Sequence, residues 1–262
     1  MKQIFPFIFT SLTYFLLNYL LERNLLSNDA PATCLPNHCF CESTVLGLIK
    51  QRSNSISSLG FCYVSIWILS GLFFQSIERN KIKNSRNKIV FLPTIFALAL
   101  LSIGIGSFLY HSTLSFIGQF LDVAGMNLLA NFILLTHLKF RIRMSNVTFF
   151  CLYLCLNILT CYLIWDFPEV RRLLFAMILL VSILFLVFFR TQRKLKSTGY
   201  LFLALAFQLA AFLIWNLDLQ KIICFPNSWF QGHAIWHILS AGVCFLLYHF
   251  YSKNHFGQET EI

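Results

Sequence analysis

Long apolar runs, separated by short polar connections, occupy most of the chain. The first run covers residues 4–21. Seven more follow, at about 56–77, 89–110, 118–138, 147–165, 173–190, 199–217 and 233–251. Each has about the 20 residues that an α-helix needs to cross the hydrocarbon core of a bilayer. The pattern predicts an all-α, polytopic membrane protein: a seven-transmembrane-helix bundle with an additional N-terminal apolar segment.

A polar stretch, residues 22–55, separates the N-terminal run from the other seven. The N-terminal run is either a signal anchor or a signal peptide, since residues 30–32 offer a small-residue cleavage site. That site lies far beyond the run, which favours a retained helix. We therefore expect an N-terminal apolar segment with a non-cytoplasmic polar stretch (1–55), a seven-transmembrane domain (56–251) and a cytoplasmic tail (252–262).

Positive charge gathers in alternate connections between the seven runs. Three connections carry twelve of the twenty Lys and Arg residues: Arg79, Lys81, Lys83, Arg86 and Lys88; Lys139, Arg141 and Arg143; and Arg190, Arg193, Lys194 and Lys196. Cytoplasmic loops of membrane proteins are enriched in Lys and Arg. The near-neutral connections 111–117, 166–172 and 218–232 are therefore expected on the non-cytoplasmic side, which is called the outer side below.

The composition excludes a soluble domain. The chain is 58% hydrophobic and 11% charged, whereas a soluble domain needs far more polar surface. The net charge of +10 would suit a nucleic-acid partner, but the basic residues gather in three short loops. The charge therefore indicates membrane topology, and we expect neither a nucleic-acid partner nor an obligatory protein partner.

Five polar residues fall at the outer ends of the predicted helices. His233 and His237 are four residues apart at the start of the last run, so both imidazoles project from one helix face. Ser107 and His111 share this spacing at the end of another run, and Asp122 lies near the start of the next. The topology places all five at the same membrane depth.

Taken singly, these residues have ordinary explanations. A histidine in a membrane helix more often makes a packing hydrogen bond than a metal bond, and Ser107 could simply allow close helix packing. Asp122 is different, because it is the only acidic residue inside an apolar run and intramembrane carboxylates are costly enough to indicate function. The combination on one side of the bundle favours a metal site.

Zinc suits this donor set. A catalytic zinc ion takes about three protein ligands and keeps a further position for water, and His111, His233 and His237 would supply three neutral imidazoles. Asp122 would act on the water as general base and acid, or would orient a ligand histidine. Ser107 would donate a hydrogen bond to the oxyanion formed when water attacks a carbonyl group.

Glu42, Gln51 and Asn54 form a weaker candidate for a second cation site. Calcium would accept their oxygens, although one carboxylate is a poor charge match. The alternative is that they are ordinary polar residues at a membrane interface.

Four cysteines are expected to share the outer side: Cys34, Cys39, Cys41 and Cys224. Disulfides form in oxidising compartments outside the cytosol. We predict that at least one of the three N-terminal cysteines pairs with Cys224, with Cys39 as first choice. Such a bond would tether the connection that precedes the last helix.

At these residues the sequence resembles the alkaline ceramidase family. The matching stretches are residues 104–114 (GIGSFLYHSTL), 119–122 (QFLD), 231–237 (QGHAIWH) and 54–59 (NSISSL). The family belongs to a superfamily of seven-helix zinc hydrolases that also includes lipid-anchor remodelling hydrolases and progestin- and adiponectin-type receptors. The resemblance runs from about Cys39 to the last helix and leaves the N-terminal run outside it.

The resemblance implies that zinc is bound by His111, His233 and His237 and that Ser107 and Asp122 serve the bound water. The implied reaction is hydrolysis of ceramide, a membrane lipid, to sphingosine and a free fatty acid. Two departures from the family pattern stand out. Val123 replaces a second carboxylate found in many members, and Gln51 stands where an acid is common, which places calcium dependence in doubt.

Two other functions stay open. The first is an acyl-ester hydrolase acting on a membrane phospholipid or a glycolipid anchor. The second is a non-enzymatic seven-helix receptor or transporter with structural zinc. A receptor would need a larger cytoplasmic surface than these short basic loops offer, and a transporter would need polar residues spread through several helices.

The loop charges predict that the site faces the non-cytoplasmic side and that the C-terminus is cytoplasmic. Single cysteines introduced in the connections 166–172 and 190–196 should differ in accessibility. We expect a membrane-impermeant thiol reagent to label only the 166–172 positions from outside, because positive loops are retained in the cytoplasm. The reverse labelling pattern would contradict the orientation.

Overall fold

The computed structural model describes residues 4–23, 29–35, 39–80, 90–188, 197–254 and 256. Within these residues it has eight α-helices and no β-strand. They are α1 (Ile4–Glu22), α2 (Arg52–Asn80), α3 (Phe91–Thr113), α4 (Phe116–Ile142), α5 (Asn146–Asp166), α6 (Arg171–Phe188), α7 (Thr198–Leu219) and α8 (Gly232–Asn254), with a 3-10 turn, η1 (Pro168–Val170), before α6. Seven of these helices, all except α6 as described to Phe188, are long and apolar enough to cross a membrane. The predicted all-α, polytopic membrane fold is confirmed.

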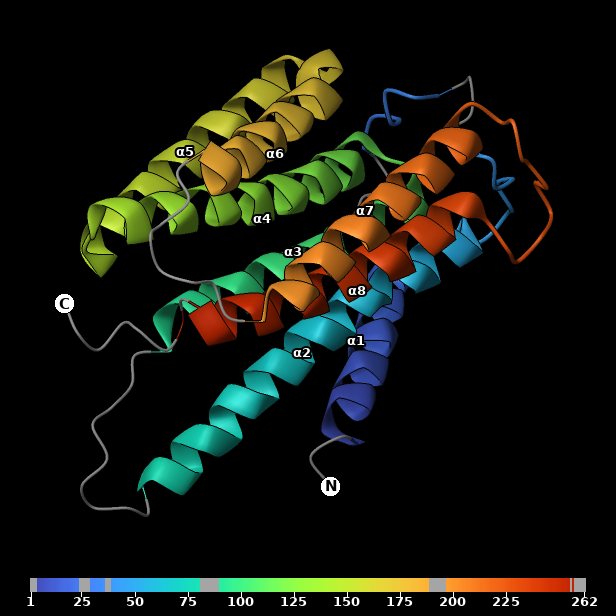
Figure 1. Ribbon diagram of the computed structural model, residues 1–262. Coiled ribbons are helices and arrows are strands. Elements are labelled where there is room, and N and C mark those ends of the chain that lie inside the picture. Colours follow the sequence, from blue (N-terminus) through green and yellow to red (C-terminus); the bar gives the residue numbers. More distant parts are fainter. Residues whose placement is uncertain are drawn as a thin grey trace.

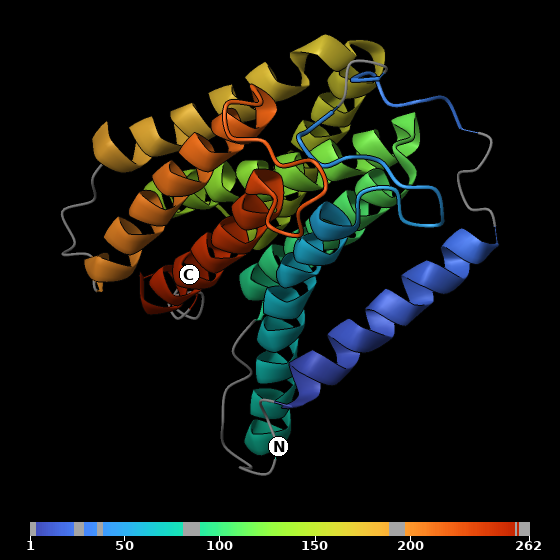
Figure 2. The same ribbon diagram turned by 90° about the vertical axis from the view of Figure 1, so that its right-hand side faces the viewer.

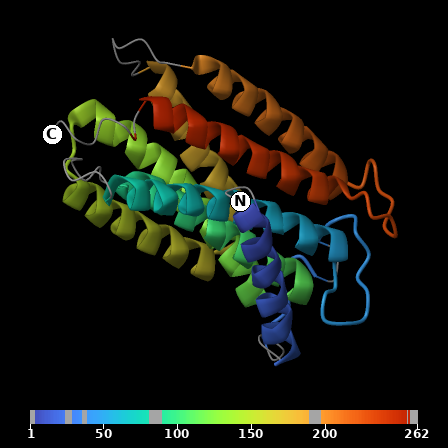
Figure 3. The same ribbon diagram turned by 90° about the horizontal axis from the view of Figure 1, so that it is seen from below.

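The helices form a bundle in which α3 lies between α2 and α4 (Figure 1). The α7/α8 pair packs on the bundle through α8 and α2, while α5 and α6 both pack on α4. Figure 3 shows the same arrangement from below. Helix α1 lies at the edge of the bundle beside α2 (Figure 2). Its Leu17 and Leu21 join a small apolar cluster with Phe108 of α3.

The first bundle helix begins earlier than the apolar pattern indicates. Helix α2 starts at Arg52, four residues before the predicted run. The Glu42 carboxylate explains this start, because its two oxygens accept the N–H groups of Ser53 (2.7 Å) and Asn54 (2.9 Å). Unpaired N–H groups at a helix start need such partners. The polar residues that precede the apolar run are therefore part of α2.

Small residues bring α3 and α4 into backbone contact. A Cβ atom at Gly106 would lie 2.6 Å from the backbone of Leu121 and 2.8 Å from the nitrogen of Asp122. On the facing helix, a Cβ atom at Gly125 would lie 2.8 Å from the backbone of Ile103. Such glycines allow membrane helices to approach closely. The contact holds Asp122 against the turn of α3 that carries Ser107.

The polar stretch before α2 is joined to the α7–α8 connection by a disulfide bond. Among the described cysteines, Cys41 pairs with Cys224 and Cys34 pairs with Cys39. An N-terminal cysteine therefore does tether the α7–α8 connection, but the first choice, Cys39, is wrong. The reason is backbone placement: the N–H of Cys41 donates to Asp218 (3.0 Å) at the end of α7, which brings Cys41 beside this connection.

The residues used to predict orientation are only partly described. Lys139 and Arg141 lie in the last turn of α4 and Arg143 caps it. Lys81, Lys83, Arg86, Lys88, Arg190, Arg193, Lys194 and Lys196 lie outside the described residues. The C-terminal ends of α4 and α8 lie at the end of the bundle opposite the histidine-bearing start of α8 (Figure 1).

The two disulfide bonds should differ in their effect on stability. The Cys41–Cys224 bond joins residues 183 apart, whereas Cys34–Cys39 joins residues 5 apart. On the chain-entropy model these loops correspond to about 5 and about 2 kcal/mol. We expect Cys41→Ser/Cys224→Ser to lower the Tm in detergent more than Cys34→Ser/Cys39→Ser does. Non-reducing peptide mapping checks the pairing, and a Cys39–Cys224 peptide would contradict it.

Candidate metal centre and active site

Three buried histidines meet at the end of the bundle where α8 begins. His111 lies in the last turn of α3, and His233 and His237 lie on the first turns of α8. Each histidine has one ring nitrogen in the cluster, and these three nitrogens lie within 4.8 Å of one another. The Nε2 atoms of His111 and His233 are 3.2 Å apart. This spacing is compact enough for one metal ion to bind all three rings.

Hydrogen bonds on the far side of two rings fix their orientation. The Nδ1 atom of His111 lies 2.8 Å from the side-chain oxygen of Gln51. The Nδ1 atom of His237 lies 3.1 Å from the carbonyl oxygen of Asn54 and 2.9 Å from the Ser57 hydroxyl. Carbonyl oxygens only accept, so both Nδ1 atoms donate and both Nε2 atoms keep a lone pair facing the centre.

The third ring, His233, is held differently. Its Nδ1 atom has no hydrogen-bond partner among the described residues. The ring stacks on Phe40, with centroids 3.6 Å apart, and lies nearly parallel to Trp236 at 5.6 Å. Aromatic packing, rather than a hydrogen bond at Nδ1, therefore holds the His233 ring. Its Nε2 atom faces His111.

Asp218 supports the backbone of this ligand turn. Its two carboxylate oxygens accept the N–H groups of Cys41 (3.0 Å) and His233 (3.1 Å). Asp218 is 1% exposed and lies within α7, so Asp122 is not the only acidic residue inside a membrane helix, as the sequence pattern had indicated. The apolar run ends one residue before Asp218, so the pattern did not place this carboxylate inside a helix. Its position shortly before Cys224 in the sequence was the signal that could have identified it.

Ser107 connects the histidines to Asp122. Its hydroxyl oxygen lies 3.3 Å from the Nε2 atom of His237, and it is a hydrogen-bond partner of the Asp122 carboxyl group. Asp122 is partly buried in the second turn of α4. The structure therefore brings together all five residues that the sequence singled out: His111, His233, His237, Ser107 and Asp122.

A buried arginine, Arg171, lies near Asp122. Net loop charge gave no sign of it, because the connection 166–172 is close to neutral. Arg171 begins α6 and is 4% exposed. Its guanidinium group donates to the side-chain oxygen of Gln119 (2.6 Å) and lies 4.9 Å from the centre of the Phe116 ring. It also interacts electrostatically with Asp122.

Glu42 and Gln51 of the proposed second cation set are used within the chain, whereas the Oδ1 atom of Asn54 has no hydrogen-bond partner among the described residues. Both oxygens of Glu42 accept backbone N–H groups at the start of α2, and the Gln51 oxygen accepts from His111. Burial raises the pKa of the Glu42 carboxyl group above its ordinary value, while the N–H donors of Asn54 and Ser53 act in the opposite direction. Glu42, Gln51 and Asn54 do lie together, but they position α2 and two histidines. Calcium binding stays a prediction.

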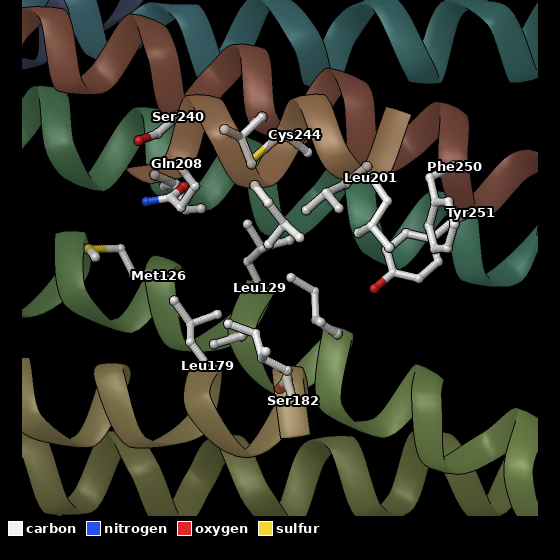
Figure 4. A pocket seen from close by; sticks show the side chains of 18 of the residues that line it. Met126, Leu129, Leu179, Ser182, Leu201, Gln208, Ser240, Cys244, Phe250 and Tyr251 are labelled. Atoms are coloured by element: carbon white, nitrogen blue, oxygen red, sulfur yellow. The ribbon is translucent and has the colours of Figure 1, made fainter. Parts of the chain in front are cut away.

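An apolar cavity lies between the helices of the bundle (Figure 4). It contains about 1000 Å³ of empty space, including its opening, between the α7/α8 pair and α4 with α6. Met126 lies one turn after Asp122 on α4, and Ser240 lies one turn after His237 on α8, and both line it. His137 and Tyr251 line the far end, where their side chains are 3.0 Å apart.

A second, more open cavity lies between the starts of α2 and α8. It is lined by Ser57, Trp229 and Ile235, among others, and has about 740 Å³ of empty space, including the open solvent at its mouth. One of its lining residues, Ser57, also contacts His237 through its hydroxyl group. Both cavities are therefore lined by residues next to the histidines on α8: Trp236 in the first and Ala234 in the second.

The fold and the site define a polytopic membrane protein with a buried three-histidine centre beside a serine and a carboxylate. A family model described as Ceramidase matches residues 33–260. The chain belongs to the ceramidase family, as the sequence resemblance predicted. No curated protein matches the sequence. Membership implies a hydrolase that acts on amide bonds and a lipid substrate.

The hydrogen bond from His111 to Gln51 should contribute to metal affinity. Gln51→Met removes the acceptor, so the His111 ring loses its orientation, and partners of this kind are typically worth roughly 10- to 100-fold in affinity. Ser57→Ala is the matched control, because His237 keeps the Asn54 carbonyl. Zinc affinity measured by chelator competition should fall for Gln51→Met and stay within a few-fold for Ser57→Ala. Equal affinities of Gln51→Met and wild type would contradict this role.

Proposed function

We propose that the protein is an integral-membrane, zinc-dependent amidase that hydrolyses ceramide to sphingosine and a free fatty acid. The observation that carries the proposal is the meeting of three buried imidazoles with Ser107 and Asp122 at one end of the bundle. Membership of the ceramidase family supports the substrate class. The loop charges support a site that faces the non-cytoplasmic side, with the C-terminus in the cytoplasm.

The donor set fits zinc. The Nε2 atoms of His111 and His237 both carry lone pairs that face the centre, because their Nδ1 atoms donate to carbonyl oxygens. The 3.2 Å between the Nε2 atoms of His111 and His233 is unfavourable for two acceptors unless a cation or a proton lies near them. Zinc bound there would lower the pKa of a coordinated water to about 7 and polarise a carbonyl oxygen.

Asp122 and Ser107 supply the proton transfer and the hydrogen bond that amide hydrolysis needs. Asp122 in its ionised form takes a proton from the attacking water and returns it to the leaving nitrogen. The Ser107 hydroxyl lies between Asp122 and His237. By turning toward the attacked carbonyl, it donates to the negative charge that develops on oxygen.

The apolar cavity suits a hydrocarbon chain of the substrate. Its lining runs along α8 from Trp236 to Tyr251, and fifteen residues of helix rise about 22 Å. A scissile amide at the histidines would therefore lie at one end of a space that can take a long chain. Burial of that chain supplies binding energy in proportion to the apolar area removed from water.

Substitution of Asp122 should separate metal binding from catalysis. Asp122→Asn should keep zinc, because it removes no proposed ligand, while hydrolysis falls roughly 100- to 10,000-fold. Ser107→Ala should also keep zinc and lose roughly 100- to 1,000-fold, as for one oxyanion donor. His111→Ala, His233→Ala and His237→Ala should lose zinc and activity together. Metal analysis alongside product formation checks all five variants, and loss of zinc from Asp122→Asn would contradict its role in proton transfer.

Substrate comparison tests the reaction itself. Purified protein should release fatty acid from ceramide and not from a phospholipid with the same acyl chain. Release from the phospholipid alone would instead support the acyl-ester hydrolase. Normal ceramide hydrolysis by the three histidine variants would contradict a zinc-dependent reaction, and no hydrolysis of either lipid by zinc-loaded protein would favour a receptor.

A further inference from the structure

We propose that Gln208 and Ser240 form a polar subsite that recognises a hydroxyl group of the substrate close to the scissile amide. The inference rests on the proposed hydrolysis of ceramide and adds a specificity determinant to it. Neither residue belongs to the stretches that resemble the family motifs. Both line the apolar cavity, at the end nearer the histidines (Figure 4).

The position of Ser240 is fixed by α8. Ser240 follows His237 by three residues, which corresponds to about 4.5 Å along the helix axis. It is 6% exposed, and its hydroxyl has no hydrogen-bond partner among the described residues. A buried hydroxyl without a partner costs free energy. An unpaired hydroxyl next to the proposed catalytic centre is therefore suited to a hydrogen bond with the ligand.

Gln208 approaches the same level from α7. The two helices are antiparallel neighbours: a Cβ atom at Gly232 would lie 2.9 Å from Asp218, and one at Gly242 would lie 3.9 Å from Phe207. These contacts place Gln208 opposite the turn of α8 that carries Ser240. In Figure 4 the amide group of Gln208 lies near Ser240 on the wall of the cavity. No hydrogen bond joins it to another described residue.

The chemistry of the pair selects a neutral group that both donates and accepts. An amide offers two donor hydrogens and one acceptor oxygen, and a hydroxyl offers one donor and two lone pairs. The rest of the wall nearby is apolar, with Met126, Leu129 and Leu205, so a charged ligand group would be desolvated without a counter-ion. An alcohol on the chain that enters the cavity meets these conditions.

Two hydroxyl groups of such lipids lie within a few bonds of the amide. One is the 3-hydroxyl of the long-chain base, and the other is the 2-hydroxyl of a 2-hydroxy fatty acid. Which of them meets Gln208 and Ser240 depends on which chain enters the cavity. The two sources share one chemistry, and deoxygenated substrates distinguish them.

The test compares kcat/KM for three lipids with wild type, Gln208→Met and Ser240→Ala. The lipids are N-palmitoyl-sphinganine, its 3-deoxy analogue and its 2-hydroxypalmitoyl analogue. We expect wild type to favour one hydroxylated lipid over its partner that lacks the hydroxyl. Each variant should reduce that preference roughly fivefold, the loss expected for one neutral hydrogen bond, and should leave the other preference unchanged.

Ser70→Ala is the control, because it removes a hydroxyl from α2 that bonds the Trp67 carbonyl oxygen, away from the cavity. Its hydroxyl preference should equal that of wild type. The proposal is overturned if Gln208→Met and Ser240→Ala change hydroxylated and deoxygenated substrates by the same factor. Ceramide hydrolysis itself would then still stand.

A binding measurement keeps the subsite testable apart from turnover. Thermal shifts of the zinc-loaded protein are recorded with sphinganine against 3-deoxysphinganine, and with 2-hydroxypalmitate against palmitate. A larger shift by one hydroxylated compound, lost in Gln208→Met and Ser240→Ala, supports the subsite even if no ceramide is cleaved. Equal shifts within both pairs would overturn it.

Discussion

Three imidazole rings can bind one metal ion only if their inward-facing nitrogens are free of protons, because each nitrogen gives its lone pair to the metal. In two of the rings, hydrogen bonds at the outward-facing nitrogens hold the proton there and leave the inward-facing nitrogens unprotonated. His111 and His237 each donate from Nδ1 to a carbonyl oxygen, supplied by Gln51 and by the backbone of Asn54. Both partners come from the first turn of α2 or the residue before it. The chemistry of α3 and α8 therefore depends on where α2 begins.

The beginning of α2 depends in turn on the stretch before it. Glu42 accepts the first N–H groups of the helix, and its own carbonyl oxygen accepts the Gln51 amide at 3.1 Å. The neighbouring Cys41 is bound to Cys224 and also donates to Asp218, which holds His233. The polar stretch before α2 is therefore part of the support of all three histidines, although it has little regular secondary structure.

The sequence predicted the features that depend on local spacing or on composition. Eight helices follow from apolar runs, and the pairing of His233 with His237 follows from four-residue spacing. The common level of Ser107, Asp122 and the histidines followed from counting alternate helices. The pairing of Cys41 with Cys224 in preference to Cys39, and the roles of Asp218 and Gln51, did not follow. These depend on contacts across 60 to 183 residues of chain, and no periodic pattern carries that information.

Phe40 has a consequence for how substrates reach the site. Its ring covers His233, and its two neighbours in sequence, Cys39 and Cys41, are both in disulfide bonds. Because both neighbours are held in disulfide bonds, the Phe40 ring has little freedom to swing away from His233. The opening between α2 and α8 is lined by Ser57, which contacts His237. For a lipid substrate, the relevant concentration is then its mole fraction among the surrounding lipids. Turnover would respond to local bilayer composition and to lateral diffusion, and dilution of the membranes in buffer would leave it unchanged.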